Sequence, residues 1–205
     1  MVNPLDIYLL VDIIGAMTIS MQEKILTTAE RLIQQMGYNA FSYKDIAREI
    51  GIKTSSIHYY YPSKEDLGLA VIEWQINYLS PLLEKIKSNK QLSLQEKLED
   101  LVNLIFSLTL EDEMKMCLGG MLASDVLSLP DKIKMKTRYF FNLLEQWITE
   151  ILTMEAYDKQ GNGLYSESNL PKYILMQLEG SLLMARLYND LSYAKLLKQF
   201  IQKLS

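Results

Sequence analysis

The chain of 205 residues has one cysteine, one histidine and few glycines or prolines, nine and five respectively. The lone Cys117 cannot form a disulfide within the chain, so we expect a reducing compartment, the cytoplasm. Sparse glycine and proline, without a repeat, exclude fibrous and disordered classes. The single histidine, His58, lies far in sequence from Cys117, and neither a nucleophile motif nor a phosphate-binding loop is found. We therefore predict no enzyme, no metal and no cofactor.

Excess positive charge is also missing, since the formal net charge is −4. This balance excludes a protein that coats nucleic acid regardless of sequence, but it permits a small basic surface. The apolar N-terminus "MVNPLDIYLLVDIIGAMTIS" contains Asp6 and Asp12, lacks a basic start and is too short to span a bilayer. We predict that residues 1–19 form an extension, either an extra helix or a stretch upstream of a true start at Met17 or Met21, and no membrane partner.

What the sequence does contain is helical periodicity. Apolar residues recur every three or four positions from residue 25 onward, and no stretch alternates as a strand would. We predict an all-α protein of nine or ten helices, with a helix-turn-helix unit at 20–68 and a larger effector-binding and dimerisation bundle at 69–205.

The first helices have clear start and stop signals. Gly37 ends a helix that begins near Ser20, and Ser42 is an N-cap for the helix that follows. Gly51 suits a tight turn, and a short helix from Thr54 to Tyr61 precedes Pro62. Two short helices joined by a turn, with longer helices around them, are typical of a helix-turn-helix.

The helices that follow have similar signals. Ser63 with Asp66, and Ser93 with Glu96, are the spacings of capping boxes, and we expect Pro81 to break or kink the helix that contains it. Further helices are predicted at 117–129, at 131–154 and in two closing segments, 170–190 and 192–204. The polar, glycine-containing stretch 158–169 is predicted to be a loop.

The stretches "ILTTAERLIQQMGYNAFSYKDIAREIG" and "IKTSSIHYYYPSKEDLGLAV" resemble the DNA-binding domain of the TetR family of bacterial transcriptional regulators. The family pattern in the second stretch is a small polar pair, an aliphatic residue, several aromatics, a Lys-Glu pair and a leucine. The resemblance covers residues 25–71 with several fixed spacings. It implies a ligand-responsive repressor that binds a palindromic DNA operator as a homodimer and is released by a small-molecule effector.

Particular DNA contacts follow from the resemblance. It implies base contacts from Lys44, Thr54, Ser55 and His58, with Ser56 beside them, and phosphate contacts from Ser42, Tyr43, Tyr59, Tyr60 and Lys64. Small polar residues at the start of a recognition helix can approach base edges, whereas tyrosine and lysine suit phosphates. His58 stands where the family usually has tyrosine, and Tyr61 is expected to pack inside. Residues 43–64 have a local charge of +2.

The closing helices resemble those through which such regulators dimerise. The predicted interface residues are Leu178, Gly180, Ser181, Leu182, Ala185, Leu197, Phe200 and Ile201. The middle helices are predicted to hold an apolar effector pocket, because methionine and aromatic side chains adapt to apolar ligands. The predicted pocket residues are Met114, Cys117, Met121, Met135, Tyr139, Phe140 and Trp147. Such a set of methionine and aromatic residues is more often part of the core, and this alternative stays open.

Two alternatives remain open. Cys117 lies in "MCLGGMLASDV", which resembles a TetR subgroup whose cysteine senses oxidants or electrophiles, and a thiol at a helix start can be reactive. That alternative is a thiol-sensing repressor. The other is a helical protein-interaction module without DNA binding, which would explain the bundle but not the polar start of the helix at Thr54.

Overall fold

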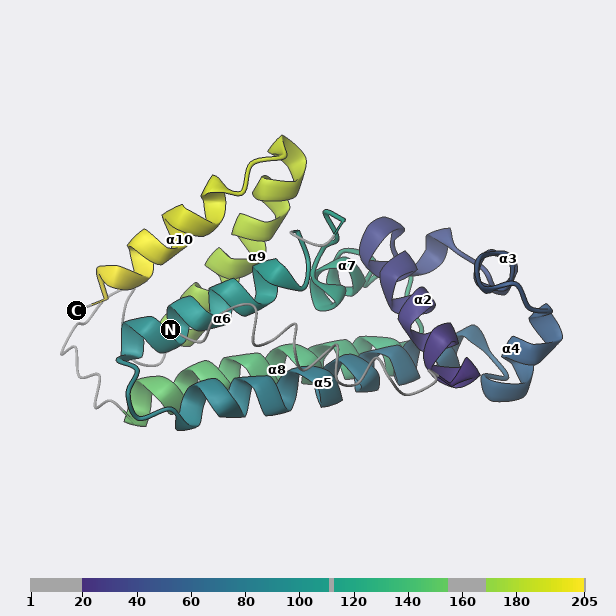
Figure 1. The fold of residues 1–205 in the computed structure, drawn as a ribbon, viewed down its shortest axis with the longest axis horizontal. Helices are drawn as coiled ribbons and strands as arrows, with labels where there is room; N and C mark the ends of the chain where they lie inside the picture. Colours follow the sequence, from purple (N-terminus) through teal and green to yellow (C-terminus); the bar gives the residue numbers. More distant parts are fainter. Residues whose placement is uncertain (1–19, 111–112, 155–168, 205) are drawn as a thin grey trace.

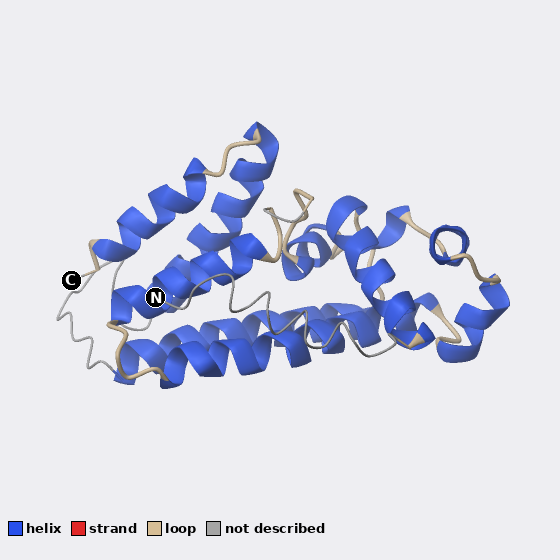
Figure 2. Cartoon of the chain, viewed as in Figure 1, coloured by secondary structure: helices blue, strands red, loops and turns tan. Residues whose placement is uncertain are grey.

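The computed structural model describes residues 20–110, 113–154 and 169–204, and within these ranges every regular element is a helix (Figures 1 and 2). The elements are α2 (Met21–Met36), the 3-10 turn η1 (Tyr38–Ala40), α3 (Tyr43–Ile50), α4 (Thr54–Tyr60), α5 (Lys64–Ser88), α6 (Leu94–Ser107), α7 (Leu118–Ser124), α8 (Asp131–Met154), α9 (Leu170–Tyr188) and α10 (Ser192–Gln202). The prediction of an all-α fold with an N-terminal helix-turn-helix is confirmed. The expected extension at 1–19 and most of the expected loop at 158–169 lie outside the described residues.

Four helices begin at a serine whose backbone N–H donates to a carboxylate three residues later. The serines are Ser20, Ser42, Ser63 and Ser93. Each pair satisfies donors that the first turn of a helix leaves without an intrahelical acceptor, which typically stabilises a helix by about 1 kcal/mol. The capping boxes predicted at Ser63 and Ser93 are therefore confirmed.

The N-terminal unit, α2 to α4 with the start of α5, occupies one end of the molecule (Figure 1). Its core consists of fully buried aliphatic side chains, among them Ile25, Ile46 and Ile57. Gly51 ends α3 with φ of 73°, a left-handed conformation that a glycine adopts without steric cost. The turn at Gly51 sets the angle between α3 and α4.

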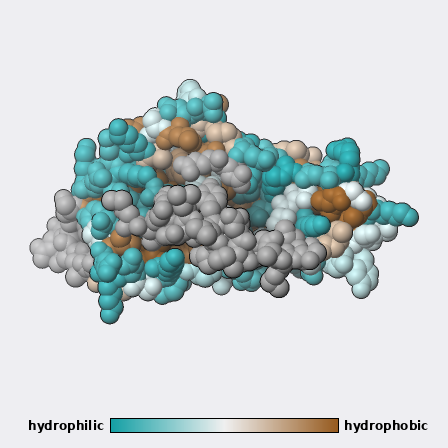
Figure 3. All heavy atoms as spheres, in the orientation of Figure 1, coloured by the Kyte–Doolittle hydropathy of each residue, from teal (hydrophilic) through white to brown (hydrophobic). Residues whose placement is uncertain are grey.

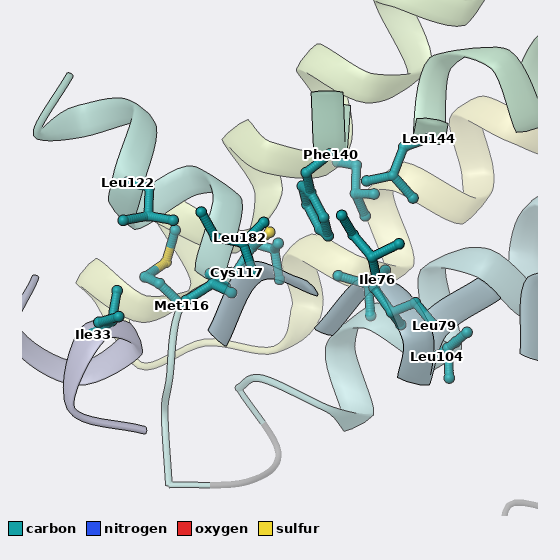
Figure 4. Packing of buried hydrophobic residues seen from close by; sticks show 14 of the residues in the cluster. Ile33, Ile76, Leu79, Leu104, Met116, Cys117, Leu122, Phe140, Leu144 and Leu182 are labelled. Carbon is teal, nitrogen blue, oxygen red and sulfur yellow. The ribbon is translucent and has the colours of Figure 1, made fainter. Parts of the chain in front are cut away.

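The long helices α5 and α8 lie side by side and run in the same direction (Figure 1). Ion pairs connect Lys132 with Glu65 near their starts, at 3.3 Å, and Lys87 with Glu150 near their ends, at 2.9 Å. The indole N–H of Trp147 donates to the carbonyl of Leu83 at 2.9 Å. Helix α10 packs on both α6 and α9, each of which also contacts α8, and part of the core appears in Figure 4. No helix within the described ranges is both long and apolar enough to cross a bilayer.

Two expected helix ends do not occur. Pro81 lies inside α5 and does not break it. The carbonyl that loses its hydrogen-bond donor there belongs to Asn77, and both residues are exposed, so water can replace the donor. Helix α7 ends at Ser124 rather than near 129, because residues 125–128 form turns in which Asp125 turns toward α2 and accepts from the backbone N–H of Tyr38 at 3.1 Å.

Candidate nucleic-acid interface

Helix α4 is held by one face and exposed on the other. Ile57 is completely buried, and the N–H of Tyr61 donates to its carbonyl at 2.8 Å, which closes the helix. On the opposite face Ser55 and Tyr59 are exposed, and Tyr59 retains 82% of its accessible surface. A seven-residue helix that is anchored by a single aliphatic residue thus projects polar and aromatic side chains outward.

Most of the predicted contact residues share this outer surface. Ser42, Lys44, Ser55, His58, Tyr59 and Tyr60 are exposed, while Thr54 and Ser56 are half-buried. The rings of Tyr59 and Tyr60 meet edge to face with centroids 5.1 Å apart. Together with Met21, Ile52, Ser55 and Ser56 they line a groove of about 540 Å³ beside α4. Four of the predicted contact residues, Ser55, Ser56, Tyr59 and Tyr60, therefore lie together along one side of α4.

Tyr43 is not on that surface, so we withdraw it from the predicted phosphate contacts. Its side chain is buried, and its hydroxyl lies 2.9 Å from the carbonyl oxygen of Tyr61 and 2.5 Å from that of Ser63. Burial, with the carboxylate of Asp66 nearby, raises the pKa of Tyr43 to about 12. Tyr43 instead fixes the connection between α4 and α5. Tyr61 is buried, as expected.

Lys64 is also turned inward, and we withdraw it for the same reason. Its amine donates to the backbone carbonyl of Phe41 and lies over two rings, 4.2 Å from the centroid of Phe41 and 5.0 Å from that of Tyr38. Burial lowers the pKa of Lys64 below its usual range. A cation placed over aromatic rings stabilises the start of α5.

His58 lies at the edge of the surface, near the end of α4. Its Nδ1 is 3.2 Å from the carbonyl oxygen of Pro62, and its ring packs against Tyr43 with centroids 4.7 Å apart. A carbonyl oxygen can only accept, so we infer that Nδ1 carries the proton. Nε2 of the neutral ring is then an acceptor, and it becomes a donor only when His58 is protonated.

Only two of the four basic residues between positions 43 and 64 contribute free positive charge to this surface. Arg48 is paired with Asp45 at 2.8 Å, and Lys64 faces inward. Lys44 and Lys53 remain exposed. Lys53 directly precedes α4 but was not predicted as a DNA contact. Its position just before a helix that starts with small polar residues could have identified it from the sequence.

The predicted effector-pocket residues do not converge on one cavity. Cys117, Phe140 and Trp147 are buried, and Met114 and Met121 are half-buried. Met135 and Tyr139 are 67% and 49% exposed, and with Leu69, Lys132 and Lys136 they line an outer groove of about 400 Å³ on α5 and α8. The prediction that all seven form a single pocket is therefore wrong.

The predicted dimer-interface residues need a similar correction. Leu178, Leu182, Ala185, Leu197 and Ile201 are at most 3% exposed within one chain, so they hold α9 and α10 in its own core. Gly180 is exposed, and Ser181 and Phe200 are half-buried. The large apolar side chains that these two helices and the turn between them do expose are Met176, Leu183, Leu187, Tyr188, Leu191 and Leu196. Apolar atoms are visible among hydrophilic ones over the α9 end of the molecule in Figure 3.

Comparisons with known proteins agree with this architecture. The profile of the family described as "Bacterial regulatory proteins, tetR family" matches residues 25–71. The crystal structure of a TetR transcriptional regulator from Legionella pneumophila is 45% identical, covers 92% of this chain and 98% of its own, and superposes with a TM-score of 0.85. An uncharacterised HTH-type transcriptional regulator from the lacX 3' region of Lactococcus lactis subsp. lactis is 29% identical over 83% of this chain and 86% of its own length.

A second curated relative matches a shorter part of the chain. The IcaR protein of Staphylococcus epidermidis, an HTH-type negative transcriptional regulator of the biofilm operon icaADBC, is 32% identical over 31% of this chain and 34% of its own length. Together, the exposed face of α4, the family profile and the full-length likeness to the Legionella protein lead to one conclusion. The chain belongs to the TetR family of bacterial transcriptional regulators.

Proposed function

We propose that this protein is a cytoplasmic repressor that binds a palindromic operator as a homodimer and releases it when a small-molecule effector binds. The single observation that carries the proposal is α4, whose exposed polar face projects from a fully buried anchor at Ile57. The name of the IcaR relative describes a negative regulator, which supports repression rather than activation.

The contacts divide by chemistry. In the proposed complex Thr54, Ser55 and Lys44 contact base edges in the major groove, because short polar side chains near the start of a recognition helix can approach bases closely. Ser42, Tyr59, Tyr60 and Lys53, which are exposed, contact phosphate oxygens. His58 would accept from a base through Nε2 when neutral, or donate to a phosphate when protonated.

Dimerisation would use the exposed apolar side chains of α9 and α10. Two recognition helices must be held at a fixed spacing to read two half-sites, and a two-fold interface supplies that spacing. Leu183 and Leu187 are 57% and 69% exposed and one turn apart on α9. They are the centre of the interface we propose.

The thiol-sensing alternative is less well supported. Cys117 is buried, and burial, together with the carboxylate of Glu179, raises the pKa of its thiol well above the usual range. A reactive cysteine requires the opposite, a lowered pKa and access to solvent. Electrophile treatment should therefore release DNA equally from the wild type and from Cys117→Ser; release from the wild type alone would favour the sensor.

A gel shift with the DNA upstream of the protein's own coding region tests the proposal. We expect a specific complex that Tyr59→Ala weakens on specific and non-specific DNA alike. Ser55→Ala should instead change the preference among operator sequences. Folded variants that bind DNA as the wild type does, at every salt concentration, would overturn these contacts.

A further inference from the structure

Glu179, in the middle of α9, has a buried carboxyl group without a cation. Among the described residues no ion pair reaches it, and its Oε1 is buried without a hydrogen-bond partner. Burial raises the pKa of Glu179 to about 7. Buried carboxylates in folded proteins are normally paired or fully hydrogen-bonded, so an acceptor that no described residue satisfies at this depth is a candidate anchor for a bound partner.

The start of α7 is shaped around this carboxyl group. The thiol of Cys117 hydrogen-bonds to it. A methyl group on Gly120 would meet Oε2 of Glu179 in its present position, so a larger side chain there would displace the carboxyl group. The carboxyl group therefore lies directly against the first turn of α7.

Several of the described side chains around this carboxyl group are apolar. Leu118, Leu122 and Leu182 are buried nearby on α7 and α9, and Phe140 of α8 packs against Gly119. Figure 4 shows Cys117 beside Leu182, with Phe140 and Ile76 beyond them. Met116 precedes α7 and Met121 lies within it, and methionine side chains repack easily. Apolar walls with one polar group are the usual composition of a small-molecule site.

We propose that Glu179 is the polar anchor of the effector site and that the effector is a small organic cation, an amine or ammonium group attached to an apolar body. This inference rests on the proposed function, because it identifies the class of effector. The ammonium group donates to Oε1, and the apolar body packs against Phe140, Leu182 and the methionines. An anion would be repelled, and a neutral donor would leave the carboxylate charge unpaired.

Binding at Glu179 has a direct route to the DNA-binding unit. Arg186 lies two turns further along the same face of α9 and donates to the carbonyl of Gln35 in the last turn of α2, at 2.6 Å. The same guanidinium lies 3.6 Å from Sδ of Met121, next to Gly120. A ligand that separates α7 from α9 at Glu179 therefore alters the contact that positions α2.

Calorimetric titration of the full chain with a panel of probes tests the inference. The panel consists of aliphatic and aromatic amines of increasing size, the corresponding alcohols and the corresponding carboxylates. We expect at least one amine to bind, at least about tenfold more tightly than its alcohol, with no binding of its carboxylate. Glu179→Gln should weaken amine binding by a similar factor. The control Glu84→Gln, which changes an exposed glutamate on α5, should leave amine binding unchanged. Gly120→Ala crowds Oε2 of Glu179 without removing its charge and should also weaken amine binding.

The inference is overturned if no amine binds, if amine and alcohol bind equally, or if Glu179→Gln binds the amine as the wild type does. If Glu179→Gln does not fold, Gly120→Ala and the comparison of amine with alcohol on the wild type decide the question. Operator binding by the wild type and Glu84→Gln, measured without amine, separates the two proposals. If neither protein binds the operator, the proposed function is refuted. If both bind the operator but the wild type does not prefer the amine, only this inference is refuted.

Discussion

Tyr43 and Tyr59 are separated by sixteen residues, and their hydroxyl groups have different surroundings. That of Tyr43 is enclosed by the carbonyls of Tyr61 and Ser63, whereas Tyr59 is 82% exposed. From the sequence, both tyrosines are equally good candidates for a phosphate contact, because a resemblance to a family does not show which way each side chain points. Only the packing of α3 against the α4–α5 connection separates a structural tyrosine from one that faces outward.

Replacing each tyrosine with phenylalanine should separate these roles. Tyr43→Phe leaves buried carbonyls without a donor and should lower the free energy of unfolding by about 1–2 kcal/mol in urea titrations. Tyr59→Phe should leave stability within about 0.5 kcal/mol but weaken DNA binding by about fivefold in fluorescence anisotropy, through one lost phosphate contact. The assignment fails if the two variants exchange effects.

Two buried glutamates should make stability depend on pH in an unusual direction. Burial raises the pKa of both Glu30 and Glu179 from 4.5 to about 7, with Lys115 opposing the shift at Glu30. Between these pH values the folded chain binds more protons than the unfolded chain, so stability decreases as pH rises. Each group contributes about 3 kcal/mol at most, fully present below pH 4.5 and lost as pH rises through 7.

Capping carboxylates such as Glu23 and Glu96 have lowered pKa values, so they make stability increase as pH rises. The contribution of Glu179 is therefore measured as the difference in stability between the wild type and Glu179→Gln. We expect Glu179→Gln to be more stable than the wild type at pH 8 and to lose that advantage near pH 4.5. Chemical unfolding at a series of pH values measures the difference. A difference that does not change with pH would show that Glu179 is ionised normally in the folded chain.

At the scale of helices, local signals decided what could be predicted. The serine–acid spacings at Ser63 and Ser93, and Gly51 after α3, set helix ends through contacts within a few residues, so the sequence was sufficient. The break expected at Pro81 does not occur, because a proline ends a helix only where the carbonyl one turn earlier cannot find another donor, and this carbonyl is exposed to water. On α8, Ile133, Phe140 and Trp147 follow a seven-residue spacing, and Met135 does not. That spacing could have separated the buried side from the exposed one.

The contact between α9 and α2 joins segments about 150 residues apart in sequence, and no local pattern predicts it. Arg186→Met keeps the apolar stem but removes the hydrogen bond from the guanidinium to the carbonyl of Gln35. We expect a loss of about 1–3 kcal/mol in the free energy of unfolding. Arg138→Met, at an exposed position on α8, should change stability by less than about 0.5 kcal/mol. Equal effects of the two substitutions would contradict a specific role for Arg186.

At the scale of the whole molecule, the residues predicted for the dimer interface were chosen for being apolar, which does not distinguish an internal core from an external one. The structure uses Leu182 and Leu197 internally and exposes Leu183 and Leu187 on the neighbouring side of α9. The interface we propose is therefore the exposed stripe around Leu183 and Leu187 on α9, and the dimer itself stays a prediction.

Leu187→Glu places a charge on that stripe and should convert the dimer to a monomer by light scattering, because a desolvated unpaired charge opposes association. Operator affinity should fall by at least about tenfold, since one half-site alone remains bound. Leu127→Glu is the matched control, because Leu127 is 96% exposed and lies outside the stripe. A wild type that is already monomeric at micromolar concentration would remove the basis for this prediction.

The most direct test of the account is selection of binding sequences from a pool of random DNA duplexes by the full-length protein. If two α4 helices of a homodimer read DNA, the enriched sequences should converge on a palindrome, with half-site centres separated by about one helical turn or a multiple of it. Ser55→Ala should alter bases within each half-site and leave the spacing unchanged. Enrichment of sequences without two-fold symmetry, or no enrichment at all, would contradict the account.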